Sequence, residues 1–188
     1  MLSIQHMPTS LQFNDYDCLP AGDYHLTMDE LRSSLLVEGA GDAGWDKSWR
    51  AQLVTNLEIV VNQLWQAGVT EIFVDGSFVE RRDHPNDIDV YFECELMDIA
   101  TGRLEERLNE IDPRKSWTWD DERREYDEKT GKRQLPMWFA YHVEAWPDFG
   151  QGSTVIHPIT GEELTHPELF RITRLGAKPK GIIKIIRK

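Results

Sequence analysis

The strongest pattern in the sequence is a long run of apolar positions at helical spacing. Its members are Trp49, Leu53, Leu57, Val60, Val61 and Leu64. Intervals of three and four place them on one face of a helix, which is expected to end at Gly68. A shorter helix is predicted from Thr27 to about Leu36, because Thr27 and Glu30 form a capping box. Leucines four residues apart predict a further helix over 103–111.

Beyond residue 68 the hydrophobic pattern changes to one that is typical of strands. Residues 71–75, with the apolar Ile72, Phe73 and Val74 at their centre, are predicted as a strand that stops at Gly76. Residues 87–93 have an apolar side chain at every second position and are predicted as a second strand. Residues 138–145 and 182–186 are predicted as two more strands. Helices followed by strands in this order predict an α+β fold, an α/β sandwich in which a mixed sheet packs against helices.

The rest of the chain is predicted to be irregular or rich in turns. Residues 1–22 are interpreted as an irregular segment that precedes a single domain over 23–188. A charged excursion from this domain is expected at about 114–135, with the tip of a hairpin at 129–132. A second hairpin tip is predicted at 159–162, where the sequence reads Ile-Thr-Gly-Glu.

Length and composition favour one folded, cytosolic domain. The chain has 188 residues, of which 40% are hydrophobic, and this is enough for a single core. No apolar run approaches the roughly 20 residues that span a bilayer, and Met1 to Leu11 does not resemble a secretion signal. The two cysteines, Cys18 and Cys94, are too few for a disulfide framework and are expected to be free thiols.

Charge is unevenly distributed along the chain, whose net charge is −12: residues 1–100 sum to −13 and residues 101–188 to +1. Such an acidic surface disfavours non-specific binding of nucleic acid, but it suits a site that collects divalent cations. From Leu169 onward the chain contains bases and no acid. These bases are Arg171, Arg174, Lys178, Lys180, Lys184, Arg187 and Lys188. This basic tail has two interpretations, a solvated end that aids solubility or a segment that binds phosphate.

Candidate chemistry is concentrated between residues 74 and 90. Asp87 and Asp89 are two positions apart in a predicted strand, so their carboxylates project from one face. Adjacent carboxylates repel unless a cation lies between them, and oxygen ligands of this kind suit Mg²⁺ or Mn²⁺. Gly76 follows a strand and allows close approach to a ligand, while Ser77 is expected to hold phosphate oxygens. Metal and phosphate ligands side by side are what phosphoryl transfer requires.

These residues resemble the signature of the DNA polymerase β-like nucleotidyltransferase superfamily, which is Gly-Ser, a short spacer, and Asp-x-Asp within a strand. The resemblance implies a nucleotidyltransferase-type fold with a third carboxylate on a neighbouring strand. Glu144 is the candidate, as a metal ligand or as general base for an attacking hydroxyl; a structural acid is the alternative. Residues 19–22, 74–89 and 180–182 are also similar to a family of small bacterial and phage nucleotidyltransferase-like proteins.

Three cations are candidates for contact with a nucleotide. Arg81, in the spacer, is a candidate for contact with a triphosphate, and a solvated loop arginine is the alternative. Lys178 and Lys180 are expected to point from a sheet edge towards a triphosphate or an RNA backbone, and weak pairing at the surface is the alternative. Asp75 is expected to face solvent or to cap a turn, and His142 is expected to be structural.

The motif and the resemblance predict a metal-dependent nucleotidyltransferase, which moves a nucleoside monophosphate from an NTP such as ATP to a hydroxyl. Asp87, Asp89 and Glu144 would hold Mg²⁺ or Mn²⁺. The acceptor stays open between RNA (tRNA included), a partner protein and a small molecule. Compact members of the superfamily suggest a toxin–antitoxin or phage–host conflict role by analogy. Two other classes stay open, a catalytically silent interaction protein of the same fold and a nucleotide sensor.

Overall fold

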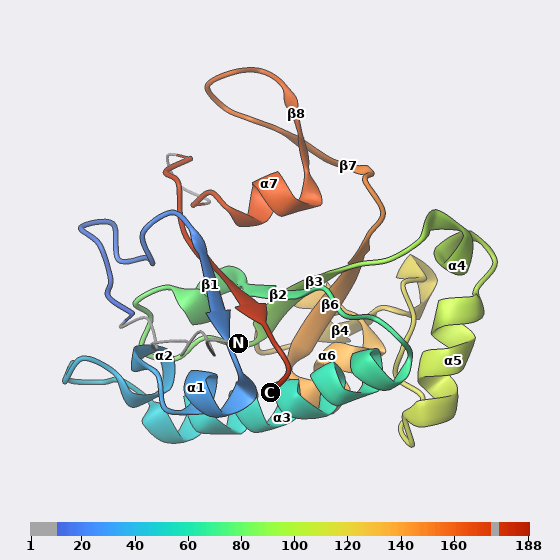
Figure 1. Ribbon diagram of the computed structural model, residues 1–188, viewed down its shortest axis with the longest axis horizontal. Helices are drawn as coiled ribbons and strands as arrows, with labels where there is room; N and C mark the ends of the chain where they lie inside the picture. The colour runs from blue at the N-terminus through green and yellow to red at the C-terminus, as the bar shows by residue number, and fades with distance from the viewer. Residues whose placement is uncertain (1–10, 174–176) are drawn as a thin grey trace, which may run out of the picture.

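A mixed five-stranded sheet lies at the centre of the protein, whose computed structural model describes residues 11–173 and 177–188 (Figure 1). The strands are β1 (Asp23–Leu26), β2 (Ile72–Asp75), β3 (Ile88–Glu93), β6 (Val143–Asp148) and β9 (Ile182–Ile185). Their order is β1-β9-β2-β3-β6, with β1 parallel to β9, β3 parallel to β6, and β2 antiparallel to both neighbours. The predicted α+β sandwich is confirmed. The features predicted at residues 1–10 and at Arg174 lie outside the described residues.

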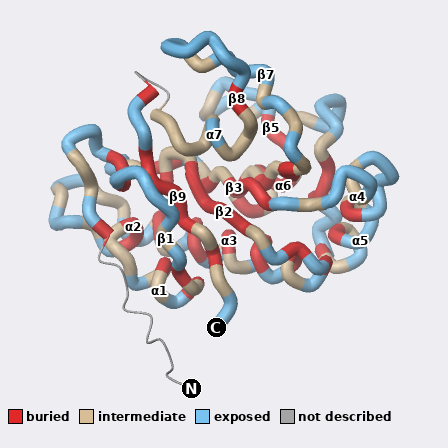
Figure 2. Tube along the Cα trace, turned by 45° about the horizontal axis from the view of Figure 1, so that its top comes forward, coloured by how far each residue is buried: buried red, intermediate tan, exposed pale blue. Residues whose placement is uncertain are grey.

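Helices cover one face of this sheet, and the predicted long helix is the main one. The helices are α1 (Met28–Arg32), α2 (Leu35–Glu38), α3 (Lys47–Gln66), α4 (Leu96–Ala100), α5 (Arg103–Ile111) and α6 (Pro136–Tyr141). The apolar face of α3 is fully buried from Leu53 to Leu64. It packs in one core with alternate strand residues such as Val74 and Val90, and Figure 2 shows the buried chain concentrated in the sheet and the helices beneath it.

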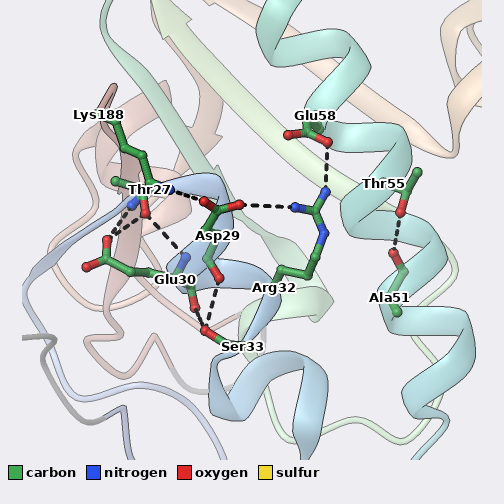
Figure 3. A network of polar contacts seen from close by, with 9 residues as sticks. All are labelled: Thr27, Asp29, Glu30, Arg32, Ser33, Ala51, Thr55, Glu58 and Lys188. Carbon is green, nitrogen blue, oxygen red and sulfur yellow. Dashed lines mark hydrogen bonds and ion pairs between the residues drawn. The ribbon is translucent and has the colours of Figure 1, made fainter.

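The predicted capping box opens α1. The Thr27 hydroxyl accepts from the amide of Glu30 while the Glu30 carboxylate accepts from the amide of Thr27 (Figure 3). Ser34 caps a second short helix, α2, so the single helix predicted here is two. An ion pair of 2.7 Å from Arg32 to Glu58 ties α1 to α3.

The strand predicted over 138–145 is wrong in its first half. Residues 136–141 form α6, and only from Val143 does the chain enter a strand, β6. Pro136 starts the helix at its first turn, where a missing N–H costs nothing. His142 ends it in the left-handed conformation with φ 52°. The aromatic residues Trp138 and Tyr141, which suggested a strand, are buried from a short helix instead.

Two hairpins project from the sheet. One consists of β4 (Glu125–Asp127) and β5 (Lys132–Gln134), and the other of β7 (Gly152–Ile156) and β8 (Glu163–Thr165). Both predicted hairpin tips are therefore confirmed. Helix α7 (His166–Phe170) follows β8 and lies on the opposite side of the sheet from α3 (Figure 1). Within the described ranges, no helix has both the length and the apolar character needed to cross a bilayer.

Candidate functional site

A cleft of about 1050 Å³ lies between the sheet, the β4–β5 hairpin and the segment from β7 to α7. Every residue that the sequence proposed for the site lines this cleft except Arg81. These lining residues are Gly76, Ser77, Asp87, Asp89, Glu144, Lys178 and Lys180. The cleft thus gathers side chains from β2, β3, β6 and the segment before β9.

Three acids form a row across the sheet at this cleft. Asp75 of β2 pairs in register with Asp89 of β3, and Asp89 pairs with Glu144 of β6. Residues opposite each other on neighbouring strands project from the same face. The sheet therefore directs three carboxylates into the cleft, and the neighbouring positions Val74 and Val90 point to the core beneath.

The chain after β2 turns sharply to bring backbone against this acid row. Gly76 has φ +75°, and a Cβ added there would lie 1.8 Å from Oδ2 of Asp89. The short 3₁₀ helix η1 (Gly76–Val79) starts at this turn and holds Ser77, half-buried, at the cleft. Glycine is needed here both for the left-handed backbone and for the close contact with a carboxylate.

Asp87 completes the acidic side of the cleft from just before β3. Its Oδ2 accepts a hydrogen bond of 2.8 Å from the indole N–H of Trp138 in α6. This contact fixes the carboxylate on the side of β6, and its charge acts on the neighbouring Glu144.

Glu144 is half-buried, with 14% of its side chain exposed, and its negative charge is only partly compensated. Burial raises the pKa of its carboxyl above the usual range, the guanidinium of Arg124 opposes this shift, and the negative charge of Asp87 adds to it. Oε1 of Glu144 lies 3.7 Å from Nη1 of Arg124 and accepts no hydrogen bond within the described part of the chain. A buried acceptor without a hydrogen-bond donor is costly, so this oxygen has a free acceptor position at the cleft.

Lys180 and Asp75 form a buried ion pair, which corrects two expectations. Asp75 is 2% exposed rather than solvated, and its Oδ1 lies 3.1 Å from Nζ of Lys180. The same Nζ lies 3.1 Å from Oε1 of Glu80. Burial lowers the pKa of Lys180, but the two carboxylates raise it by more, so the lysine is cationic. Lys180 is therefore neutralised by its own chain, and β9 lies inside the sheet rather than at an edge.

The other two candidate cations are placed differently from each other. Arg81 points away from the cleft, where its guanidinium pairs with the carboxylates of Asp42 and Asp17. The predicted contact of Arg81 with a triphosphate therefore has no support in its position. Lys178 lines the cleft with an exposed side chain, and its ammonium lies 5.4 Å from the centre of the Tyr16 ring.

A buried arginine that was not among the predicted site residues supports the Gly76–Ser77 turn from below. Arg50 of α3 is 0% exposed and donates to the carbonyls of Phe78 (2.9 Å), Glu80 (3.1 Å) and Arg82 (2.7 Å). It also donates to Leu36 at 2.6 Å. Its spacing from the apolar face of α3 is the signal that would have placed it on the buried side.

A second group outside the prediction is cationic and comes from the β4–β5 hairpin. Arg124, Lys132 and Arg133 line the cleft on the side of Glu144. This segment was predicted to be a solvated excursion because it is mostly charged. Charge density alone does not indicate which side chains fold back over the sheet, so the pattern gave no signal for this group.

The oxygen donors at the cleft suit a divalent cation by chemistry. Asp87, Asp89 and Glu144 supply carboxylate oxygens alone, which Mg²⁺ and Mn²⁺ prefer. The unpartnered oxygen of Glu144 is an observation in favour of such a ligand. Within residues 11–173 and 177–188, no group of three or more His, Cys, Asp or Glu side chains is already gathered around one point as a metal would require.

Fold and cleft together define an α+β protein with a carboxylate row beside a glycine turn. The chain belongs to a family of unknown function, DUF6932, whose model matches residues 11–186. No curated protein and no solved structure matches the chain.

Proposed function

We propose that this protein is a metal-dependent nucleotidyltransferase, which transfers a nucleoside monophosphate from an NTP to a hydroxyl group. The observation that carries the proposal is the register of Asp89 with Glu144, beside a turn at Gly76 and Ser77 in one cleft. Carboxylates beside a glycine turn and a serine hydroxyl suit the binding of a metal and phosphates together.

Asp87, Asp89 and Glu144 are the residues that would hold Mg²⁺ or Mn²⁺. When bound, the cation would neutralise negative charge on the reacting phosphates. The carboxylates supply oxygens from β6 and from both sides of the start of β3, so the sheet fixes their spacing. The negative charge of Asp87 raises the pKa of Glu144, and a cation between the carboxylates would relieve this repulsion.

Ser77 would bind the triphosphate. Ser77 lies in η1 and lines the cleft together with Gly76 and Asp89. Gly76 has no side chain where phosphate and carboxylate come close, and Arg50 holds the turn from the opposite side. The chain thereby positions the phosphates before reaction, which is the main contribution of a protein to phosphoryl transfer.

Glu144 would have one of two roles in this reaction. As a metal ligand it would use its unpartnered oxygen. As a general base it would take the proton of the attacking hydroxyl, and the pKa raised by burial brings it closer to the working pH of a base. Glu144 must be ionised in both roles, because a metal ligand and a general base both act as the carboxylate.

The test is incubation with each of the four labelled NTPs, Mg²⁺ and a cell lysate. Label should move onto a macromolecule or small molecule with the wild type. Asp89→Asn should abolish transfer and metal-dependent NTP binding with the fold intact, whereas Glu93→Gln, on the same strand outside the cleft, should change neither.

Other outcomes of this experiment assign the protein to the alternatives. NTP bound with metal and released unchanged would make it a nucleotide sensor. No NTP binding with or without metal would make it an interaction protein of this fold. Transfer that survives Asp89→Asn would remove the cleft from the reaction.

A further inference from the structure

The charged side chains of the β4–β5 hairpin segment are unevenly distributed between the cleft and the solvent. Its charged side chains at the cleft are Arg124, Lys132 and Arg133, here called the hairpin wall, and all are cationic. The acids of the same segment do not line the cleft. They are Asp120, Asp121, Glu122, Glu125, Asp127 and Glu128. Opposite charges that are mixed along the sequence are thus separated in space, which leaves a positive surface facing an acidic sheet.

Hydrogen bonds hold the hairpin wall in place. Nη2 of Arg133 donates to the carbonyl of Arg124 at 2.6 Å, and Nη1 of Arg124 donates to the carbonyl of Arg133 at 3.2 Å. Arg124 also pairs with Asp121 at 2.8 Å outside the cleft. Among the described residues, Lys132 forms no ion pair, although its charge lowers the pKa of Glu144.

The hairpin wall lies on the far side of the carboxylates from Ser77. Ser77 follows β2, the acids continue through β3 to Glu144 of β6, and Arg124 comes next at 3.7 Å from Glu144. In phosphoryl transfer the attacking and leaving oxygens are roughly in line. If the triphosphate binds at Ser77, the acceptor whose hydroxyl attacks would therefore bind on the side of Glu144, next to the hairpin wall.

We propose that the hairpin wall binds phosphate groups of the acceptor, and that this acceptor is an RNA strand. The inference rests on the proposed function and names its second substrate. An RNA strand brings hydroxyls that are flanked by phosphates, whereas the serine, threonine or tyrosine of a protein acceptor brings a hydroxyl alone. The net charge of −12 disfavours a polyanion on the acidic surface of the protein, so contact with RNA depends on local groups of cations such as the hairpin wall.

The experiment measures binding of a labelled single-stranded RNA of mixed sequence by fluorescence anisotropy, without NTP. Lys132→Glu should weaken binding, and Lys132→Glu with Arg133→Glu should weaken it at least about tenfold. The slope of log Kd against log salt should fall by about 0.7 for each phosphate that the variant no longer neutralises on a single strand. The matched controls are Lys129→Glu and Lys129→Glu with Arg123→Glu, which make the same charge change in the same segment away from the cleft.

Each outcome of the binding experiment either supports or overturns RNA as the acceptor. Equal losses of affinity in the cleft and control variants, unchanged affinity in both, or no RNA binding by the wild type would overturn the inference. Tripolyphosphate binding that depends on Lys132, without RNA binding, would overturn RNA in favour of a small phosphorylated acceptor. The single Lys132→Glu variant removes no hydrogen bond of the hairpin, so it keeps the test valid if the double variant misfolds. RNA binding is measured without NTP, so the measurement does not depend on whether the protein is an active enzyme. Label transfer onto a protein, together with RNA affinity that is the same in the wild type and the cleft variants, would refute RNA as the acceptor and leave the proposed function standing.

Discussion

Gly76 and Asp89 are fitted to each other across β2 and β3. The carboxylate Oδ2 of Asp89 occupies space 1.8 Å from where a Cβ of residue 76 would lie. Cγ and Cβ of Asp89 also lie close to that position, at 2.7 and 3.0 Å, so rotation of the carboxylate alone does not clear the contact. The turn that carries Ser77 and the position of the Asp89 carboxylate therefore both require that residue 76 has no Cβ.

Gly76→Ala should destabilise the protein by about 3 kcal/mol, from left-handed backbone strain and a steric clash together. Gly161→Ala is the matched control, because Gly161 has nearly the same φ, +76°, and nothing within 4 Å of its Cβ position. The control should cost about 1 kcal/mol. Urea denaturation measures both, and equal losses of stability would show that the clash with Asp89 is easily relieved.

Lys180 is expected to contribute to stability, and Lys178 is expected to contribute to nucleotide binding. Lys180→Met leaves Asp75 and Glu80 without their cation, so unfolding should become easier by about 3–5 kcal/mol. Lys178→Met removes an exposed side chain and should change stability by less than about 0.5 kcal/mol. Thermal and urea unfolding measure this difference.

Nucleotide binding supplies the second half of that test. Lys178→Glu should weaken binding of NTP and reduce its dependence on salt, because the ammonium of Lys178 is exposed at the cleft. A stable Lys180→Met protein would contradict the structural role of the buried pair. Unchanged NTP affinity in Lys178→Glu would assign that lysine to the surface.

Arg50 should be the arginine to which the fold is most sensitive. Arg50→Met would leave four carbonyls without their donor, and the expected loss of stability is more than about 3 kcal/mol. Arg107→Met removes a single bond to the carbonyl of Ala67 and should cost about 1 kcal/mol. Arg50→Lys should recover only part of the stability, because an ammonium has three donors and no planar fork. Full recovery in urea denaturation would contradict the geometric argument.

Acid should destabilise the protein partly through Asp112. Burial raises the pKa of its carboxyl, but hydrogen bonds from Ser116, from Tyr141 (2.6 Å) and from backbone amides lower the pKa by more, so the net shift is downward. A group whose pKa is lower in the folded protein contributes stability above its unfolded pKa. That stability is lost as pH falls through the folded value, below about pH 4.

Asp112→Asn should therefore lower the melting temperature at neutral pH and flatten its fall between neutral pH and acid. Melting curves from pH 7 to about pH 3 measure this. Asp98→Asn, at a surface pair with Arg103, is the control and should change stability at neutral pH by less than about 1 kcal/mol. A steeper acid dependence in Asp112→Asn would reverse the assigned sign.

Local signals in the sequence predicted much of the fold. The period of α3, the capping box at Thr27 and both hairpin tips depend on residues close in sequence, and all were placed correctly. A second capping box, Thr165 with Glu168, begins α7 and had the same signal, so this helix was predictable too. By contrast, the split of residues 136–148 into α6 and β6 is decided by packing against α3 as well as by Pro136.

The candidate site was predicted as a set of residues but not as an electrostatic arrangement. The spacing of Asp87 and Asp89 indicates acids on one face, and the cleft contains them together with Glu144. Which cations remain available could not be predicted, because ion pairs form between distant segments. Lys180 is neutralised by Asp75, Arg81 by Asp42, and the hairpin wall comes from a segment without apolar pattern.

The place of β9 in the sheet links the cleft to the order in which the protein folds. β9 pairs with both β1 and β2, so β1 joins the sheet only through a strand at the opposite end of the described sequence. Contacts between such distant segments carry a large loop-closure entropy and slow the folding of a domain. Lys180 precedes β9, so Asp75 lacks its counter-charge until that closure occurs. Docking of residues 180–185 therefore both completes the sheet and supplies the cation that pairs with the buried carboxylate of Asp75.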